Sequence, residues 1–117
     1  MRLFLISTLM FSSMGVIFAQ EENYREEPLC ATVETDIQHS EGYTRSKGKD
    51  RDRADNALRH LSEFDSAFQR GKFDKDKLDQ AIDDVKNLAD NNPMGPEDRR
   101  LLLEDLRRLR EFRAHRG

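Results

Sequence analysis

Apolar residues recur at spacings of three and four along the second half of the chain, which is the pattern of amphipathic helices. The first stripe predicts a helix over residues 51–70 and consists of Ala54, Ala57, Leu58, Leu61, Phe64 and Phe68. The second predicts a helix over residues 74–90 and consists of Leu78, Ile82, Val85, Leu88 and Ala89. The third predicts a helix over residues 96–114 and consists of Leu101, Leu102, Leu103, Leu106, Leu109 and Phe112.

The breaks between these stripes carry residues that end and begin helices. Gly71 is a C′ glycine, and Asp74 is a suitable N-cap between Phe73 and Leu78, which have the spacing of a hydrophobic staple. Pro96 suits the first position of the third helix. We therefore predict that residues 51–117 form an all-α domain, a small antiparallel three-helix bundle. The alternative is a helical hairpin whose third helix docks on a partner.

The N-terminal residues 1–19 differ from the rest of the chain. Arg2 precedes an apolar stretch over residues 3–19, and the small residue Ala19 lies just before a polar run. This is typical of a secretory signal peptide, so we expect export to the periplasm or the medium. After cleavage we expect no stable membrane insertion. An uncleaved N-terminal anchor is the alternative, although four hydroxyl residues and the short length disfavour a membrane span.

Residues 20–50 are predicted to be a disordered acidic segment. Their few hydrophobic residues are scattered, and acidic side chains outnumber basic ones. Such a segment buries too little apolar surface to offset the entropy of ordering. It carries the net negative charge of the mature chain, since residues 51–117 hold 15 acids and 15 bases. No basic domain or stripe is present, so we expect no nucleic-acid partner.

Cys30 is the single cysteine and lies in this acidic segment. In an exported protein an odd cysteine indicates a free thiol or an intermolecular disulfide, and in a disordered segment it would be accessible. The negative neighbours Glu26, Glu27 and Glu34 disfavour the thiolate. We interpret Cys30 as an incidental thiol or as half of a disulfide to another chain, because nothing nearby activates it for catalysis.

The third predicted helix is rich in arginine. Arg100, Arg107 and Arg110 form a possible docking face for an acidic partner, since a guanidinium group binds carboxylates in bidentate fashion. The simpler interpretation is a surface covered by ion pairs, in which Asp105 pairs with Arg108 at a spacing of three residues.

No catalytic, cofactor or metal motif emerges from the sequence. The acidic run that begins at Asp74 fails as a calcium loop, because the loop positions that require an oxygen ligand, Gly and Glu hold Leu78, Asp79 and Val85. The three histidines lack metal-ligand spacing. We therefore expect no enzymatic activity, no cofactor and no metal site.

Residues 63–110 resemble small secreted bacterial proteins of unassigned function, on the segments FDKDKLDQAI and DLRRLR. The resemblance implies an exported helical domain. The segment GPEDRRLLLEDL is also similar to a helix opening of helical periplasmic stress and metal-resistance proteins, although their LTxxQ signature is absent. We expect an exported, non-enzymatic protein that binds or scaffolds another protein or forms a homodimer. The alternative is a periplasmic stress- or cation-responsive helical protein.

Overall fold

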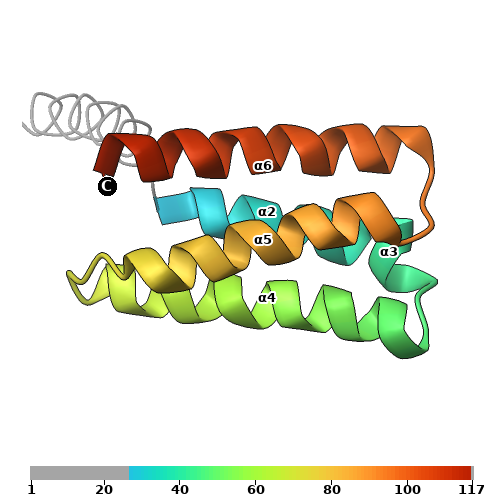
Figure 1. Ribbon diagram of the computed structural model, residues 1–117, viewed down its shortest axis with the longest axis horizontal. Coiled ribbons are helices and arrows are strands. Elements are labelled where there is room, and N and C mark those ends of the chain that lie inside the picture. Colours follow the sequence, from blue (N-terminus) through green and yellow to red (C-terminus); the bar gives the residue numbers. More distant parts are fainter. Residues whose placement is uncertain (1–26, 117) are drawn as a thin grey trace, which may run out of the picture.

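The computed structural model describes residues 27–116, which fold into helices only (Figure 1). The helices are α2 (Glu27–His39), α3 (Glu41–Thr44), α4 (Gly48–Gln69), α5 (Lys75–Asn91) and α6 (Pro96–Arg116). The described range contains no strand, so the predicted all-α class is confirmed. The predicted signal peptide lies outside the described residues.

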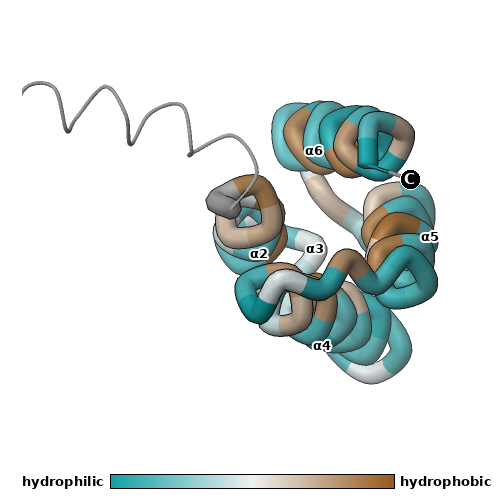
Figure 2. The backbone as a smooth tube through the Cα atoms, turned by 90° about the vertical axis from the view of Figure 1, so that its left-hand side faces the viewer, coloured by the Kyte–Doolittle hydropathy of each residue, from teal (hydrophilic) through white to brown (hydrophobic). Residues whose placement is uncertain are grey.

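Within residues 27–116, four long helices surround one core. Figure 1 shows that α2, α4, α5 and α6 run alternately in opposite directions, and Figure 2 shows them at the four corners of the bundle. Helix α4 packs on α5 and α5 packs on α6, while α2 closes the bundle by contacting both α4 and α6. This is the up-down-up-down arrangement of a four-helix bundle, so the predicted number of three helices is wrong.

Helix α2 is the element that the sequence prediction missed. The segment assigned to disorder contains α2, α3 and the start of α4. Cys30, Val33 and Ile37 lie three and four residues apart on one face of α2, and they are 2%, 0% and 0% exposed. This short stripe is sufficient to order α2, because α4 and α6 supply the apolar surface on which it packs.

The helix ends agree with the sequence prediction. Gly71 has a φ of 88°, and its N–H donates to the carbonyl of Phe68 at 2.9 Å. The N–H of Lys72 donates to the carbonyl of Ala67 at 2.9 Å, which completes a Schellman motif. The two helix starts are also confirmed. The carboxylate of Asp74 accepts from the N–H of Lys77, and α6 begins at Pro96.

Asn92 joins three elements at the end of the bundle where α5 meets α6. Its side-chain amide donates to the carbonyl of Gly42 at 2.8 Å and to the carbonyl of Asp50 at 2.7 Å. Its amide oxygen accepts from Arg53 at 3.0 Å. Asn92 is 1% exposed, so these bonds satisfy a polar group that has no access to water.

Glu41 ties α3 to the start of α6 beside this site. Its backbone N–H donates to the carboxylate of Asp98 at 2.9 Å, and its own carboxylate accepts from the N–H of Gly95 at 2.9 Å. A Cβ atom on the neighbouring Gly42 would lie 2.6 Å from the Cε of Met94. The connections at this end of the bundle are therefore closely packed.

Four phenylalanines hold the opposite end together. The ring centroids of Phe64, Phe68, Phe73 and Phe112 lie 5.6 to 6.1 Å apart, mostly in edge-to-face arrangements. The guanidinium of Arg116 lies 5.2 Å from the ring centroid of Phe68. This cluster fixes the end of α6 against the turn between α4 and α5. Within residues 27–116 no helix has both the length and the apolar character of a membrane span.

Candidate functional site

The outward side of α6 brings the predicted docking residues together. Arg100, Leu103, Arg107 and Arg110 follow one another at intervals of three or four residues along one exposed stripe. We call these four residues the arginine–leucine face. It is exposed because the opposite side of the same helix, which includes Leu102 and Leu109, is buried in the core.

The arginines differ in how far they are already paired. Arg100 donates to Glu97 at 2.7 Å, and Arg107 donates to Glu104 at 2.5 Å and to Glu111 at 2.6 Å. These pairs lie at helical spacing on an exposed surface, where water weakens their attraction. Arg110 is exposed and forms no ion pair with any residue in the described part of the chain. The interpretation of this surface as one covered by ion pairs thus fits Arg100 and Arg107. The N–H donors of Arg110 remain available to a partner.

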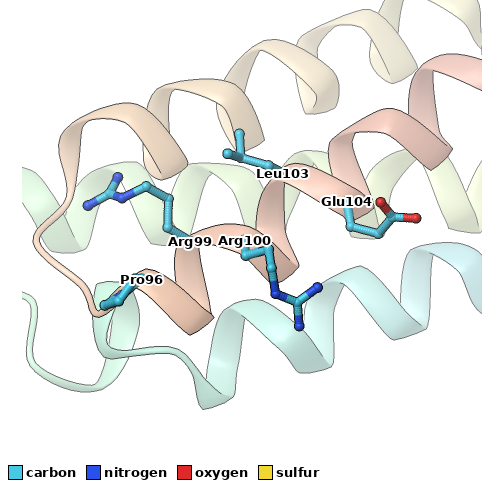
Figure 3. A pocket seen from close by; sticks show the side chains of 5 residues that line it. All are labelled: Pro96, Arg99, Arg100, Leu103 and Glu104. Carbon is cyan, nitrogen blue, oxygen red and sulfur yellow. The ribbon is translucent and has the colours of Figure 1, made fainter.

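A shallow groove begins at the upstream end of this face. Figure 3 shows its lining side chains, all from the first half of α6: Pro96, Arg99, Arg100, Leu103 and Glu104. Arg99 is anchored inside the fold, because its guanidinium donates to the backbone carbonyls of Ala89 and Asn92. The groove is open to solvent, so it can accept an apolar side chain beside a guanidinium group but does not enclose a small molecule.

Cys30 is not accessible, contrary to the prediction. It is 2% exposed on the inner side of α2. Burial, together with the negative charges of Asp65 and Glu34, raises the pKa of the Cys30 thiol to about 12. The thiol is therefore protonated and shielded in the folded chain, and a disulfide to another chain would require α2 to leave the bundle.

The acidic residues of α5 are largely occupied by structural roles. Asp74 caps the helix, and other carboxylates bind side chains of neighbouring elements or of the same helix: Asp79 with Arg113, Asp84 with His60, and Asp90 with Lys86. The Arg113 guanidinium lowers the pKa of Asp79. Among residues 27–116, no three potential metal ligands come together.

Asp105 lies in the core, so the prediction that it pairs with Arg108 on the surface is wrong. Asp105 is 0% exposed, and neither of its carboxylate oxygens has a hydrogen-bond donor in the described chain. Its spacing in the sequence could have indicated this burial. Asp105 lies three residues after Leu102 and four before Leu109, which are both on the buried side of α6. Its spacing to Arg108 fits an ion pair equally well, and that interpretation concealed its place in the core.

No protein-family model, no curated protein and no solved structure matches the chain. The resemblance of residues 63–110 to small secreted bacterial proteins therefore remains a prediction.

Proposed function

We propose that the chain is an exported, non-enzymatic helical protein that binds an acidic helical segment of another protein through the arginine–leucine face of α6. The observation that carries this proposal is the exposure of leucine on that helix. Leu101 and Leu103 are 38% and 44% exposed, and they are the large hydrophobic side chains that the described part of the chain presents to solvent.

The chemistry of the face favours an acidic partner. Leu103 offers an apolar contact at the groove, and Arg110 offers an unpaired guanidinium two turns further along the helix. An apolar anchor surrounded by charged groups is the usual composition of a small protein interface. A second copy of the chain is a poorer occupant, because it would bring the unpaired guanidinium of Arg110 to the interface in place of a carboxylate.

Export is the second part of the proposal and rests on residues 1–19. Cleavage after Ala19 would leave a mature chain that starts at Gln20, which precedes the first residue of α2 by seven positions. The residues that form the bundle would therefore all remain in the exported protein. Export would also place the protein and its partner in the same extracytoplasmic compartment.

The proposal is tested on the protein recovered from the extracytoplasmic fraction of its native host. We expect an intact mass that begins at Gln20 and a native mass that includes a different, acidic chain. Arg110→Glu should release that chain, whereas Asp83→Lys, which changes an exposed charge on α5, should retain it. A monomer, or a complex of identical chains, would refute the binding proposal, and recovery only from the cytoplasm would refute export.

The cation-responsive alternative makes a different prediction. It would require the carboxylates of α5 to exchange their present partners, such as Arg113 and His60, for a metal ion. We expect calorimetric titration with calcium, zinc and copper to give no heat of binding and no change in melting temperature. Saturable heat at stoichiometric metal would favour the alternative over the binding proposal.

A further inference from the structure

Asp105 is an acidic side chain whose surroundings do not support a negative charge. Its carboxyl group lies inside the bundle, on the side of α6 that faces α2, and it is 0% exposed. Within the described chain no N–H or O–H group donates to either of its oxygens. A buried carboxylate without donors is strongly unfavourable. The group must therefore either bind a proton or gain access to water.

The residue that faces Asp105 across the helix interface is another acid. Asp36 of α2 interacts with it directly, and Glu104 and Arg108 of α6 act on it from its own helix. No group of α4 or α5 in the described chain is among those that act on the charge of Asp105, and the fully buried side chains of these two helices are apolar. Among residues 27–116, Arg108 is thus the one cation that acts on Asp105, and its Nε also lies 3.7 Å from a carboxylate oxygen of Glu104.

Binding of a single proton removes the repulsion between Asp36 and Asp105. With both groups ionised, Asp36 and Asp105 would place two negative charges at a desolvated interface. With Asp105 protonated, its O–H can donate to the carboxylate of Asp36, and repulsion becomes a hydrogen bond between α6 and α2. Burial, followed by the interaction with Asp36, raises the pKa of Asp105 to about 8.

We propose that Asp36 and Asp105 form a proton-binding site that holds α2 on α6 at acidic and neutral pH and releases α2 when the proton is lost. Release leaves the hairpin of α4 and α5 packed on α6, since those contacts do not involve α2. It also exposes Cys30, which lies on the inner side of the released helix. The protein would therefore present a buried apolar surface and its thiol in response to alkaline pH.

Cys30 provides a direct readout of this release. The mature full chain is labelled with a thiol reagent at several pH values, and each rate is divided by the rate for the same chain in concentrated guanidinium chloride. This ratio removes the intrinsic reactivity of the thiol and reports the fraction of time for which α2 is open. We expect the ratio to rise by at least about tenfold between about pH 6 and pH 9, as Asp105 loses its proton.

Asp105→Asn supplies the decisive comparison, because an amide of the same shape can donate to Asp36 at every pH. We expect its ratio to stay constant within about twofold over the same range. Asp83→Asn removes an exposed acid from α5 and should behave as the unmodified chain does. If Asp105→Asn does not fold, Asp36→Asn provides the second test. It removes the opposing charge and should make the rise smaller without abolishing it, because Asp105 remains buried.

Several results would overturn the proposal. An equal rise in Asp105→Asn, or in Asp36→Asn where that variant is used, would show that another group controls the opening. A collapse of far-ultraviolet circular dichroism at pH 9 would show that the whole bundle unfolds rather than α2 alone. Protection of Cys30 at pH 9 by millimolar calcium would identify a cation site in place of a proton site. A rise that is lost in Asp105→Asn, or smaller in Asp36→Asn where that variant is used, supports the proposal if most helicity is retained and calcium has no effect.

Discussion

The side-chain amide of Asn92 donates to the backbone carbonyl of Gly42 at 2.8 Å, across 50 positions of the sequence. The same amide donates to the carbonyl of Asp50, and both bonds lie at the end of the bundle where α5 meets α6. Asn92 therefore connects the loop after α5 to α3 and to the start of α4. The bond to Gly42 contributes strongly to stability, because it is buried from water.

Asn92→Ala should lower the free energy of unfolding by about 2–3 kcal/mol, since it removes the side-chain donor from the buried carbonyl of Gly42 and from the carbonyl of Asp50. The matched control is Asn91→Ala, because Asn91 is exposed and its amide bonds only within α5. That control should cost about 0.5 kcal/mol or less. Chemical denaturation of both variants measures the difference, and equal losses would contradict a connecting role for Asn92.

A comparison of two leucine variants distinguishes a core position from a position on the proposed binding face. Leu88 on α5 is 0% exposed and Leu103 on α6 is 44% exposed. Leu88→Ala should destabilise the fold by about 2–5 kcal/mol through lost burial and a cavity. Leu103→Ala should change stability by about 0.5 kcal/mol or less. If thermal or chemical unfolding shows a large loss for Leu103→Ala, then Leu103 supports the fold and is not available as a contact surface.

Stability should depend on pH through Asp105. Its pKa is about 8 in the folded chain and near 4 in an unfolded one, so the folded state binds the extra proton between these values. This contribution to stability is fully present below about pH 4 and is lost as pH rises toward about 8. Other acids, such as Asp79, have lowered pKa values and contribute in the opposite direction.

The comparison with Asp105→Asn isolates the effect of Asp105 from those other acids. Relative to this variant, the unmodified chain should become progressively less stable between pH 5 and pH 8. Denaturant titrations at three or four pH values provide the measurement. Parallel stability curves for the two proteins would show that Asp105 has an ordinary pKa in the folded chain.

Cys30 should be unreactive in the folded chain at neutral pH. Because it is 2% exposed and the pKa of its thiol is raised to about 12, labelling should be at least about 100-fold slower than in the unfolded chain. Under mild oxidation the folded protein should remain free of disulfide-linked dimers on a non-reducing gel. Rapid dimer formation under native conditions would instead support the original interpretation of an accessible thiol.

The parts of the fold that the sequence predicted are those where several local signals coincide. The turn between α4 and α5 has a glycine with positive φ at Gly71 and a capping carboxylate at Asp74, and each lies at the end of a long apolar stripe. Helix α6 likewise begins at Pro96. Such signals depend on neighbouring residues alone, so they can be recognised without knowing what the helix packs against.

The missed features depend on contacts between distant segments. Helix α2 has three buried apolar residues, Cys30, Val33 and Ile37, within an acidic segment, and its order comes from packing on α4 and α6. Asp105 was predicted to be on the surface because Arg108 is close in sequence, whereas the structure places Asp36 of α2 opposite it. The proton-binding site could not be predicted once α2 had been assigned to disorder.

The most direct test of the proposed binding function places a photo-crosslinking amino acid at position 103 and, in a second chain, at position 83, both in the native host. Both positions are exposed, but only Leu103 belongs to the arginine–leucine face. We expect a discrete crosslinked product with an acidic protein from position 103, its loss when Arg110→Glu is added, and none from position 83. No product at position 103, or the same product from both positions, would contradict binding through α6.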